Sequence, residues 1–224
     1  AYQRQLRGAA LEDVRDLIVD QLRQQNAQTV ISEYIAGLQI AYGLTTDIPF
    51  PQLPRVPVEV DDDPFLGTAG APVEIVIFAE YQCPYCATVT PTMEQLITEY
   101  PGKLQVVYRD FPLSFHDRAI PAAIAANCAG EQEKYWEMHN ILMGNQRALT
   151  DENFMTWAGQ LSLDTGKFTS CLSDPAQTAE VDADFQAGVT AGVNGTPSIY
   201  VNGMKASPSH AALAELIERE LSEG

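Results

Sequence analysis

The stretch AEYQCPYCAT, residues 79 to 88, holds Cys83 and Cys86, two of the four cysteines of the chain. A Cys-x-x-Cys pair either supplies two ligands to a metal site or carries two electrons as a dithiol. Structural zinc needs four ligands. Cys128 and Cys171 each stand alone, and the three histidines show no ligand spacing. The pattern therefore favours redox chemistry and predicts no metal site.

The elements around the pair indicate which cysteine reacts first. The apolar run PVEIVIFAEY (72–81) predicts a buried strand, and apolar residues recur at helical spacing after the pair. Cys83 would then stand at a helix N-terminus, where free N–H groups and the helix dipole stabilise a thiolate and lower its pKa. We assign Cys83 as the nucleophile and Cys86, one turn further in, as the residue that resolves a mixed disulfide. Pro84 suits a first helical turn, where its missing donor costs nothing.

A second candidate segment is Gly195-Thr196-Pro197, which leads into the predicted strand PSIYVNG. A proline at the head of a strand leaves neighbouring backbone free to pair with an extended substrate chain. The alternative is an ordinary turn that starts the strand. Considered together with the cysteine turn, the functional interpretation is favoured. Pro84, Tyr85, Thr196 and Pro197 are therefore the predicted active-site loop and substrate-binding residues.

The rest of the chain divides into a helical extension, a linker and a main domain. Residues 1–46 contain helical periodicity over 10–42, which predicts a long amphipathic helix or two shorter ones. Its apolar stripe either packs on the main domain or forms an oligomer. Residues 47–72 are rich in proline and aspartate and predict an extended tether. Residues 73–224 predict an α/β domain with a mostly helical insert at about 113–192.

Composition excludes several classes of protein. The formal net charge of −17 argues against nucleic-acid binding, which needs a basic surface. No run of about 18 apolar residues is present, so no membrane span is predicted. No cofactor motif is visible. No signal peptide is visible either, and the chain starts at Ala1 without methionine, so its first residues say little about export.

Four motifs resemble a known family. The stretches FAEYQCPYC, VVYRDFPL, AANCAGEQEKYWEMHNIL and GVNGTPSIYVNG are similar in content and order to the DsbA-like thiol–disulfide oxidoreductases, from about Asp61 to the C-terminus. The resemblance implies a thioredoxin fold interrupted by a helical domain, with a cis Pro197 facing the cysteine pair. It also implies work outside the cytoplasm on unfolded or partly folded cysteine-containing proteins, with a quinone-linked membrane partner.

The chain departs from this family at one position of the strand before the cysteines. Many relatives carry a buried acid there, whereas this chain has Ile77, and its nearest acid is Glu80. Glu80 either transfers protons or is a solvated charge at the strand end. The second interpretation is slightly favoured by the sequence.

The resemblance also bears on Cys128 and Cys171, because equivalent cysteines pair in a subset of relatives. We therefore expect a structural disulfide between them, with buried free thiols as the alternative.

Other conspicuous side chains are given structural roles. Trp136 and Trp157 are predicted in the core of the insert, and Arg109 with Asp110 as a local pair at a strand end. For His116 a surface or capping role is favoured over a place near the active site, where the ring could titrate usefully.

The leading functional hypothesis is a dithiol oxidase that works through Cys83 and Cys86 without a further cofactor. An oligomeric isomerase or reductase is the alternative if residues 10–42 associate, and a chaperone-like client-binding protein is a third. The sequence leaves the redox potential, the clients and the oligomeric state open.

Overall fold

The computed structural model describes residues 15, 34, 37–38, 54–58 and 60–223. The chain separates into two compact units, Ala1–Gln52 and Leu53–Gly224. In the first unit the four described residues are helical. The remainder of the predicted helix over 10–42 and of the extension 1–46 lies outside the described residues, and its proposed role in oligomerisation stays a prediction.

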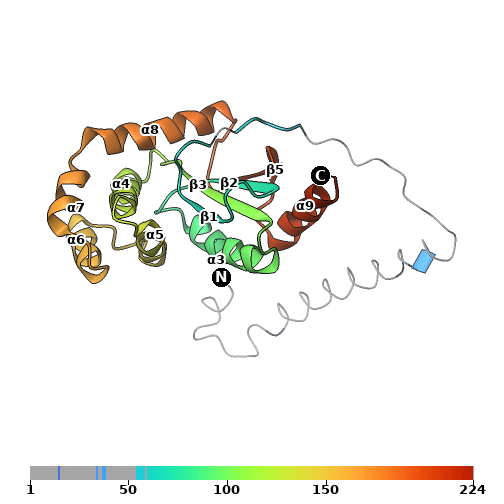
Figure 1. The fold of residues 1–224 in the computed structure, drawn as a ribbon, viewed down its shortest axis with the longest axis horizontal. Coiled ribbons are helices and arrows are strands. Elements are labelled where there is room, and N and C mark those ends of the chain that lie inside the picture. The colour runs from blue at the N-terminus through green and yellow to red at the C-terminus, as the bar shows by residue number, and fades with distance from the viewer. Residues whose placement is uncertain (1–14, 16–33, 35–36, 39–53, 59, 224) are drawn as a thin grey trace. The chain divides into compact units, whose positions relative to one another are not determined.

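The second unit is built on a five-stranded sheet with the order β1-β3-β2-β4-β5. Strands β2 and β3 are parallel, and all other neighbours are antiparallel. Figure 1 shows α3 and α9 on one side of this sheet and α8 on the other. The elements are β1 (Phe65–Gly67), β2 (Val73–Ala79), α3 (Pro84–Glu99), β3 (Leu104–Asp110), α4 (Ala119–Gly130), α5 (Tyr135–Gly144), α6 (Asp151–Gln160), α7 (Thr165–Leu172), α8 (Pro175–Thr190), β4 (Ser198–Val201), β5 (Met204–Ala206) and α9 (His210–Glu223).

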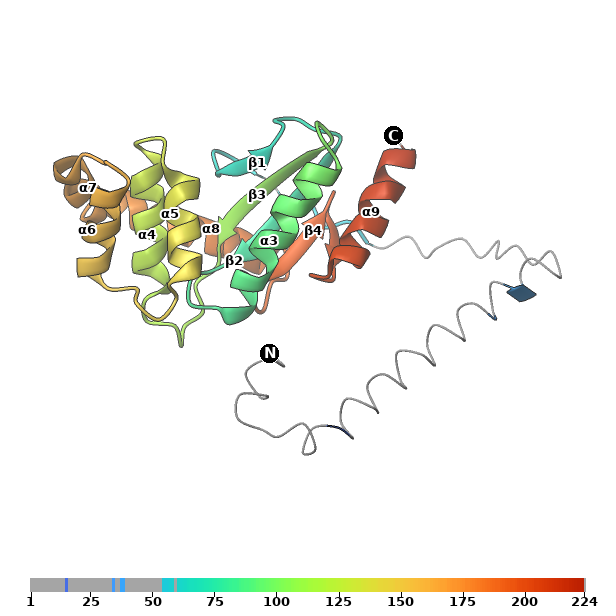
Figure 2. The ribbon, with the colours of Figure 1, turned by 90° about the horizontal axis from the view of Figure 1, so that it is seen from below.

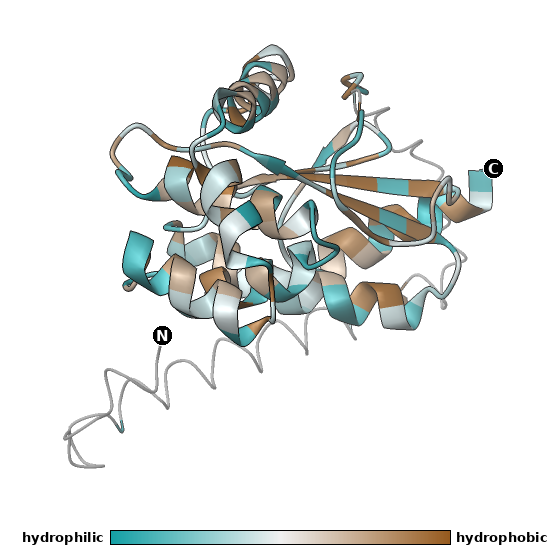
Figure 3. Ribbon diagram, turned by 60° about the vertical axis from the view of Figure 1, so that its left-hand side comes forward, coloured by the Kyte–Doolittle hydropathy of each residue, from teal (hydrophilic) through white to brown (hydrophobic). Residues whose placement is uncertain are grey.

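Both faces of β2 are buried, which is why its sequence is an almost continuous apolar run. Ile75 and Ile77 belong to one core cluster, which includes residues of α3, α5 and α9. Val76 and Phe78 point to the opposite face and belong to a second cluster. Successive side chains of a strand alternate between faces, so this one strand contributes to both cores. The central strands are correspondingly hydrophobic in Figure 3.

Helices α4 to α8 form the insert between β3 and β4, and Figure 2 shows α4 to α7 grouped at one end of the sheet. α4 is rich in alanine and almost wholly buried, so neighbouring helices can pack closely against it. The ends of the insert helices follow local capping rules: the Thr150 side chain accepts from Asn153 N, and Asp174 caps α8 directly before Pro175. This arrangement confirms the predicted fold class, a thioredoxin-like α/β domain with a helical insert.

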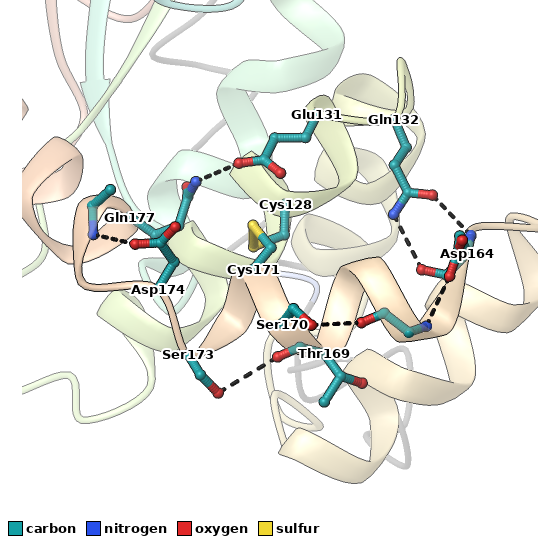
Figure 4. The surroundings of a disulfide bond; sticks show 12 residues. Cys128, Glu131, Gln132, Asp164, Thr169, Ser170, Cys171, Ser173, Asp174 and Gln177 are labelled. Atoms are coloured by element: carbon teal, nitrogen blue, oxygen red, sulfur yellow. Dashed lines mark hydrogen bonds between the residues drawn. A yellow bond between two sulfur atoms is a disulfide. The ribbon is translucent and has the colours of Figure 1, made fainter.

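Cys128 on α4 and Cys171 on α7 form a disulfide with a Cα–Cα distance of 5.7 Å. Figure 4 shows it linking the two helices. The expected pairing is therefore present in the structure.

Residues 54–72 differ from the predicted free tether. Phe65–Gly67 forms β1 and pairs with β3. Arg55 bridges to Met204, and Val56 N donates to Gly203 O at 2.8 Å. Part of the segment thus belongs to the sheet, because its backbone donors and acceptors find partners at both sheet edges.

The predicted local pair of Arg109 and Asp110 is wrong. Arg109 projects from β3 to Asp63, at 3.1 Å, and to Asp184 of α8, at 2.6 Å. Asp110 is buried as well, and its backbone N–H donates to Asp184 at 2.8 Å. Adjacent residues of a strand point to opposite faces, so distant acids, and not the neighbour in sequence, compensate the arginine.

Among the helices that the structure describes, none combines the length and the apolar character needed to cross a membrane.

Candidate active site

Cys83 lies in the short connection between β2 and α3. The strand ends at Ala79, and Cys83 is the N-cap residue of α3 with extended backbone angles of φ −70° and ψ 115°. Pro84 is the first helical residue, and Cys86 N donates to Cys83 O at 3.1 Å. The Cys83 sulfur therefore sits at the positive end of a 16-residue helix, as the sequence predicts.

Strand pairing brings the second predicted segment to the same place. β2 and β4 are antiparallel, with Phe78 opposite Ser198. Thr196 and Pro197 precede β4, so they lie beside the segment that follows β2. The Cys83 Sγ donates to the Thr196 carbonyl at 3.4 Å, and the Thr196–Pro197 peptide bond is cis.

The two sulfurs have different surroundings. The hydrogen bond with Cys86 lowers the pKa of Cys83 to about 5, against the effect of burial and with help from Thr196 and nearby backbone N–H groups. The same hydrogen bond and burial raise the pKa of Cys86 far above its ordinary value. The reduced pair thus holds a thiolate at Cys83 and a thiol at Cys86, which is the charge distribution of a nucleophile and a resolving residue.

Two aromatic side chains of the cysteine turn and of the loop between β3 and α4 are exposed. Tyr85 is 71% exposed, and Phe115 is 75% exposed. The Phe115 ring lies 4.6 Å from the His116 ring, centroid to centroid. Pro84 is exposed as well.

Glu80 is not the solvated charge that the sequence favoured. Its side chain is 1% exposed, and its Oε2 accepts from Gln82 N at 2.7 Å. His116 Nδ1 lies 2.5 Å from Glu80 Oε1. His116 itself is partly exposed, and the loop between β3 and α4 places its ring against the acid that follows β2.

The insert contributes further residues that sequence reasoning did not select. Gln146 Nε2 donates to Cys83 O at 2.7 Å and ties the loop after α5 to the cysteine turn. A small cavity of about 20 Å³ adjoins Cys86 and is also lined by Pro197, Trp136 and His139.

Neither Gln146 nor His139 has a local sequence signal for such a role, because only the packing of the insert brings them there. Trp136 also differs from its predicted core position: it is half-buried, and its Nε1 donates to Phe65 O at 3.1 Å. Trp157 is buried, as expected.

Carboxylates that could offer ligands to a metal ion also occur among the described residues. The groups are Asp61, Asp62 and Glu180, and Asp63, Glu180 and Asp184, with ligand atoms within 4.8 Å of one another. Arg109 already places a positive charge against Asp63 and Asp184. Neither group contains a cysteine of the pair.

Comparison with known proteins supports a redox site. Residues 59–219 match the model of a family described as thioredoxin. The chain is similar to a thioredoxin-like oxidoreductase from Silicibacter pomeroyi DSS-3, with 27% identity, a TM-score of 0.65, and coverage of 71% of this chain and 92% of that one. It is also similar to BdbD from Bacillus subtilis, with 22% identity, a TM-score of 0.65, and coverage of 71% and 93%. At this lower identity the likeness shows the fold alone.

Curated relatives are larger proteins. The Na(+)/H(+) antiporter NhaA 3 of Salinispora tropica is 36% identical over 151 residues, which are 67% of this chain and 23% of the antiporter. The antiporter NhaA of Herminiimonas arsenicoxydans is 29% identical over 168 residues, 75% of this chain and 26% of that protein. The chain spans about a quarter of the length of these relatives.

Proposed function

Because the chain belongs to the thioredoxin family and has the fold of its DsbA-like members, we propose that it is a protein thiol–disulfide oxidoreductase. Within that class we propose a dithiol oxidase that introduces disulfides into exported proteins. The observation that carries the proposal is geometric: Cys83 is the N-cap residue of α3, its sulfur lies 3.4 Å from the Thr196 carbonyl, and Cys86 lies one turn further in. The lowered pKa of Cys83 and the raised pKa of Cys86 agree with this arrangement.

The reaction moves two electrons from client to enzyme. A client thiolate attacks the Cys83 sulfur of the Cys83–Cys86 disulfide, and Cys86 leaves and takes up a proton. A second client thiolate then attacks the client sulfur of the mixed disulfide, so the client disulfide forms and Cys83 leaves as a thiolate. A low pKa makes Cys83 a good leaving group and stabilises the reduced enzyme, which favours oxidation of the client.

The surroundings of the pair support a polypeptide substrate. Tyr85 and Phe115 offer exposed apolar contacts for an unfolded chain, and backbone near Thr196 and Pro197 would pair with an extended segment. Glu80 is the candidate for proton transfer to and from the thiols. A membrane quinone-linked partner would reoxidise the pair, in an extracytoplasmic compartment.

Two measurements test the proposal. Equilibration with glutathione gives the reduction potential: a value near about −120 mV supports an oxidase, whereas a value near about −270 mV favours a reductase. In the second test, oxidised enzyme is mixed with a reduced, unfolded protein that contains two cysteines. Cys83→Ser should abolish disulfide transfer. Cys86→Ser cannot form the disulfide and is instead mixed with an oxidised client, where the Cys83 thiolate attacks the client disulfide and one client sulfur leaves as a thiolate. The mixed disulfide should accumulate until reductant releases it, because the resolving thiol is missing. Transfer that survives Cys83→Ser would disprove the site.

The competing interpretation, an oligomeric isomerase or reductase, depends on residues 10–42, almost all of which lie outside the described residues. Gel filtration of the chain with and without residues 1–46 tests it. Monomers in both cases would remove the main support for the isomerase. A purely chaperone-like role leaves the intact cysteine pair without a purpose.

A further inference from the structure

Glu80, which is buried and close in sequence and space to Cys83, forms an acid–base pair with His116, which is partly exposed. The Glu80 carboxyl has one oxygen on the backbone N–H of Gln82 and the other on His116 Nδ1, at 2.7 and 2.5 Å. Its backbone carbonyl in turn accepts from Cys83 N at 3.4 Å. Two contacts therefore hold the Glu80 carboxyl, and a third links the Glu80 backbone to that of the nucleophile, Cys83.

Burying a carboxylate is unfavourable unless hydrogen bonds or a cation compensate its charge. Burial raises the pKa of Glu80 above its ordinary value, and the Gln82 and His116 contacts act against this rise. The Glu80 side chain is 1% exposed, whereas that of His116 is 21% exposed. His116 thus contacts both the buried acid and the solvent.

We infer that His116 is a positioning residue that acts through Glu80: it holds the buried carboxyl ionised next to the cysteine pair, so that Glu80 can exchange a proton with the thiols during disulfide transfer. The inference rests on the proposed dithiol chemistry. Ionised Glu80 accepts the proton of the second client thiol, and the resulting client thiolate attacks the mixed disulfide. Cys83 leaves as a thiolate, and the proton then passes from Glu80 through His116 to solvent.

Other charged groups face the pair. Cys83 and Asp110 interact electrostatically with Glu80. Asp117 and Arg118 follow His116 in sequence, but Asp117 lies 3.5 Å from the Gln82 amide, and Arg118 pairs with Asp151. His116 is therefore the basic group in contact with the acid among the residues that the structure describes.

The test is the pH profile of disulfide transfer to a reduced two-cysteine peptide, measured by stopped flow between pH 4 and 8. His116→Ala removes the partner of Glu80, so the carboxyl ionises at higher pH. If the pKa of Glu80 rises by one unit, the rate should fall about tenfold on the acidic limb of the profile and change little near pH 8. Each rate is expressed relative to the wild type, because ionisation of the peptide thiols is common to all variants.

A double-mutant cycle separates this role from a structural one. Glu80→Gln should remove the pH dependence due to the carboxyl, and His116→Ala should then have no further effect. His116→Asn keeps a hydrogen-bond donor without the imidazole ring and serves if the alanine variant does not fold. The matched control is His210→Ala, because His210 and Glu99 form a 2.7 Å pair on the exposed surface.

The inference would be overturned if the acidic limb of the pH–rate profile stayed in place in both His116 variants. It would also be overturned if His116→Ala lowered the rate as much in the Glu80→Gln background as in the wild type. A wild-type protein that transfers no disulfide would instead refute the proposed function. The two failures are therefore distinguishable.

Discussion

The Cys83 thiol donates a hydrogen bond of 3.4 Å to the backbone carbonyl of Thr196, which lies 113 positions further along the chain. Thr196 Oγ1 is buried and has no hydrogen-bond partner among the described residues. A thiolate at Cys83 can accept from this hydroxyl, whereas a thiol can donate to the carbonyl. Thr196 thus offers one group to each protonation state of the nucleophile, and the hydroxyl bonds more strongly to the thiolate than to the thiol.

Thr196→Val should raise the pKa of Cys83 above its value of about 5, because the side chain keeps its shape but loses the donor. The oxidised enzyme should then be a weaker oxidant, because the reduced form loses part of its thiolate stabilisation. Absorbance of the thiolate at about 240 nm, followed against pH, measures the change. Thr98→Val is the control, since this threonine bonds only within α3. An unchanged titration would show that the hydroxyl does not stabilise the thiolate.

The stability of the reduced protein should depend on pH in a defined window. The pKa of Cys83 is lowered to about 5 in the folded state, so the thiolate contributes stability at neutral and higher pH that is lost as the pH falls through about 5. The oxidised protein has no thiol there. Measured below pH 8, where the Cys86 thiol stays protonated, the melting temperature of the reduced form should rise relative to the oxidised form from pH 5 upward. In Cys83→Ser, which cannot form the active-site disulfide, the melting temperature of the reduced protein should lack this contribution from the Cys83 thiolate.

Removing the Cys128–Cys171 disulfide should lower the free energy of unfolding by about 4 kcal/mol. The bridge closes a loop of 43 residues, and in the chain-entropy model this constraint on the unfolded state has about that value. Urea denaturation of the Cys128→Ala, Cys171→Ala double variant measures the loss. A double variant as stable as the wild type, with both compared in the absence of reductant, would indicate that the bridge is not formed.

Arg109→Met should destabilise the fold by about 3–5 kcal/mol, because Asp63 and Asp184 would remain buried without their cation. Lys134→Ala breaks an exposed pair with Glu137 and should cost about 0.5 kcal/mol or less. Chemical denaturation of both variants gives the comparison. A loss for Arg109→Met no larger than that for Lys134→Ala would mean that the buried network contributes no net stability.

Gly188→Ala should destabilise the domain by about 1–3 kcal/mol. A Cβ at this position of α8 would lie 2.6 Å from Phe111 Cδ2 and 3.0 Å from Phe78 Cδ1, so the helix must move off the sheet. Gly159→Ala in α6 meets nothing within 4 Å and should be neutral or stabilising by up to about 1 kcal/mol. Thermal melts of the two variants distinguish crowding from helix propensity.

Local patterns determined much of the fold and part of the site. The strand, helix and strand around Cys83 and Cys86 follow from apolar runs and helical spacing, and Pro84 fixes where α3 begins. These signals act between neighbours in sequence, so they can be read without the tertiary structure. The same holds for the caps at Thr150 and Asp174.

Only the tertiary structure decided the surroundings of the cysteine pair. The register of β2 against β4 brings Thr196 to Cys83, and the loop after β3 turns His116 onto Glu80. Likewise, packing of the insert brings Gln146 and His139 to the surroundings of the cysteine pair. Arg109 pairs with Asp63 and Asp184 instead of its neighbour Asp110. Burial and distant partners set the charge of each of these groups, and a sequence pattern carries neither. The sequence by itself therefore determined which residues react, and the packing of distant segments decided what surrounds them.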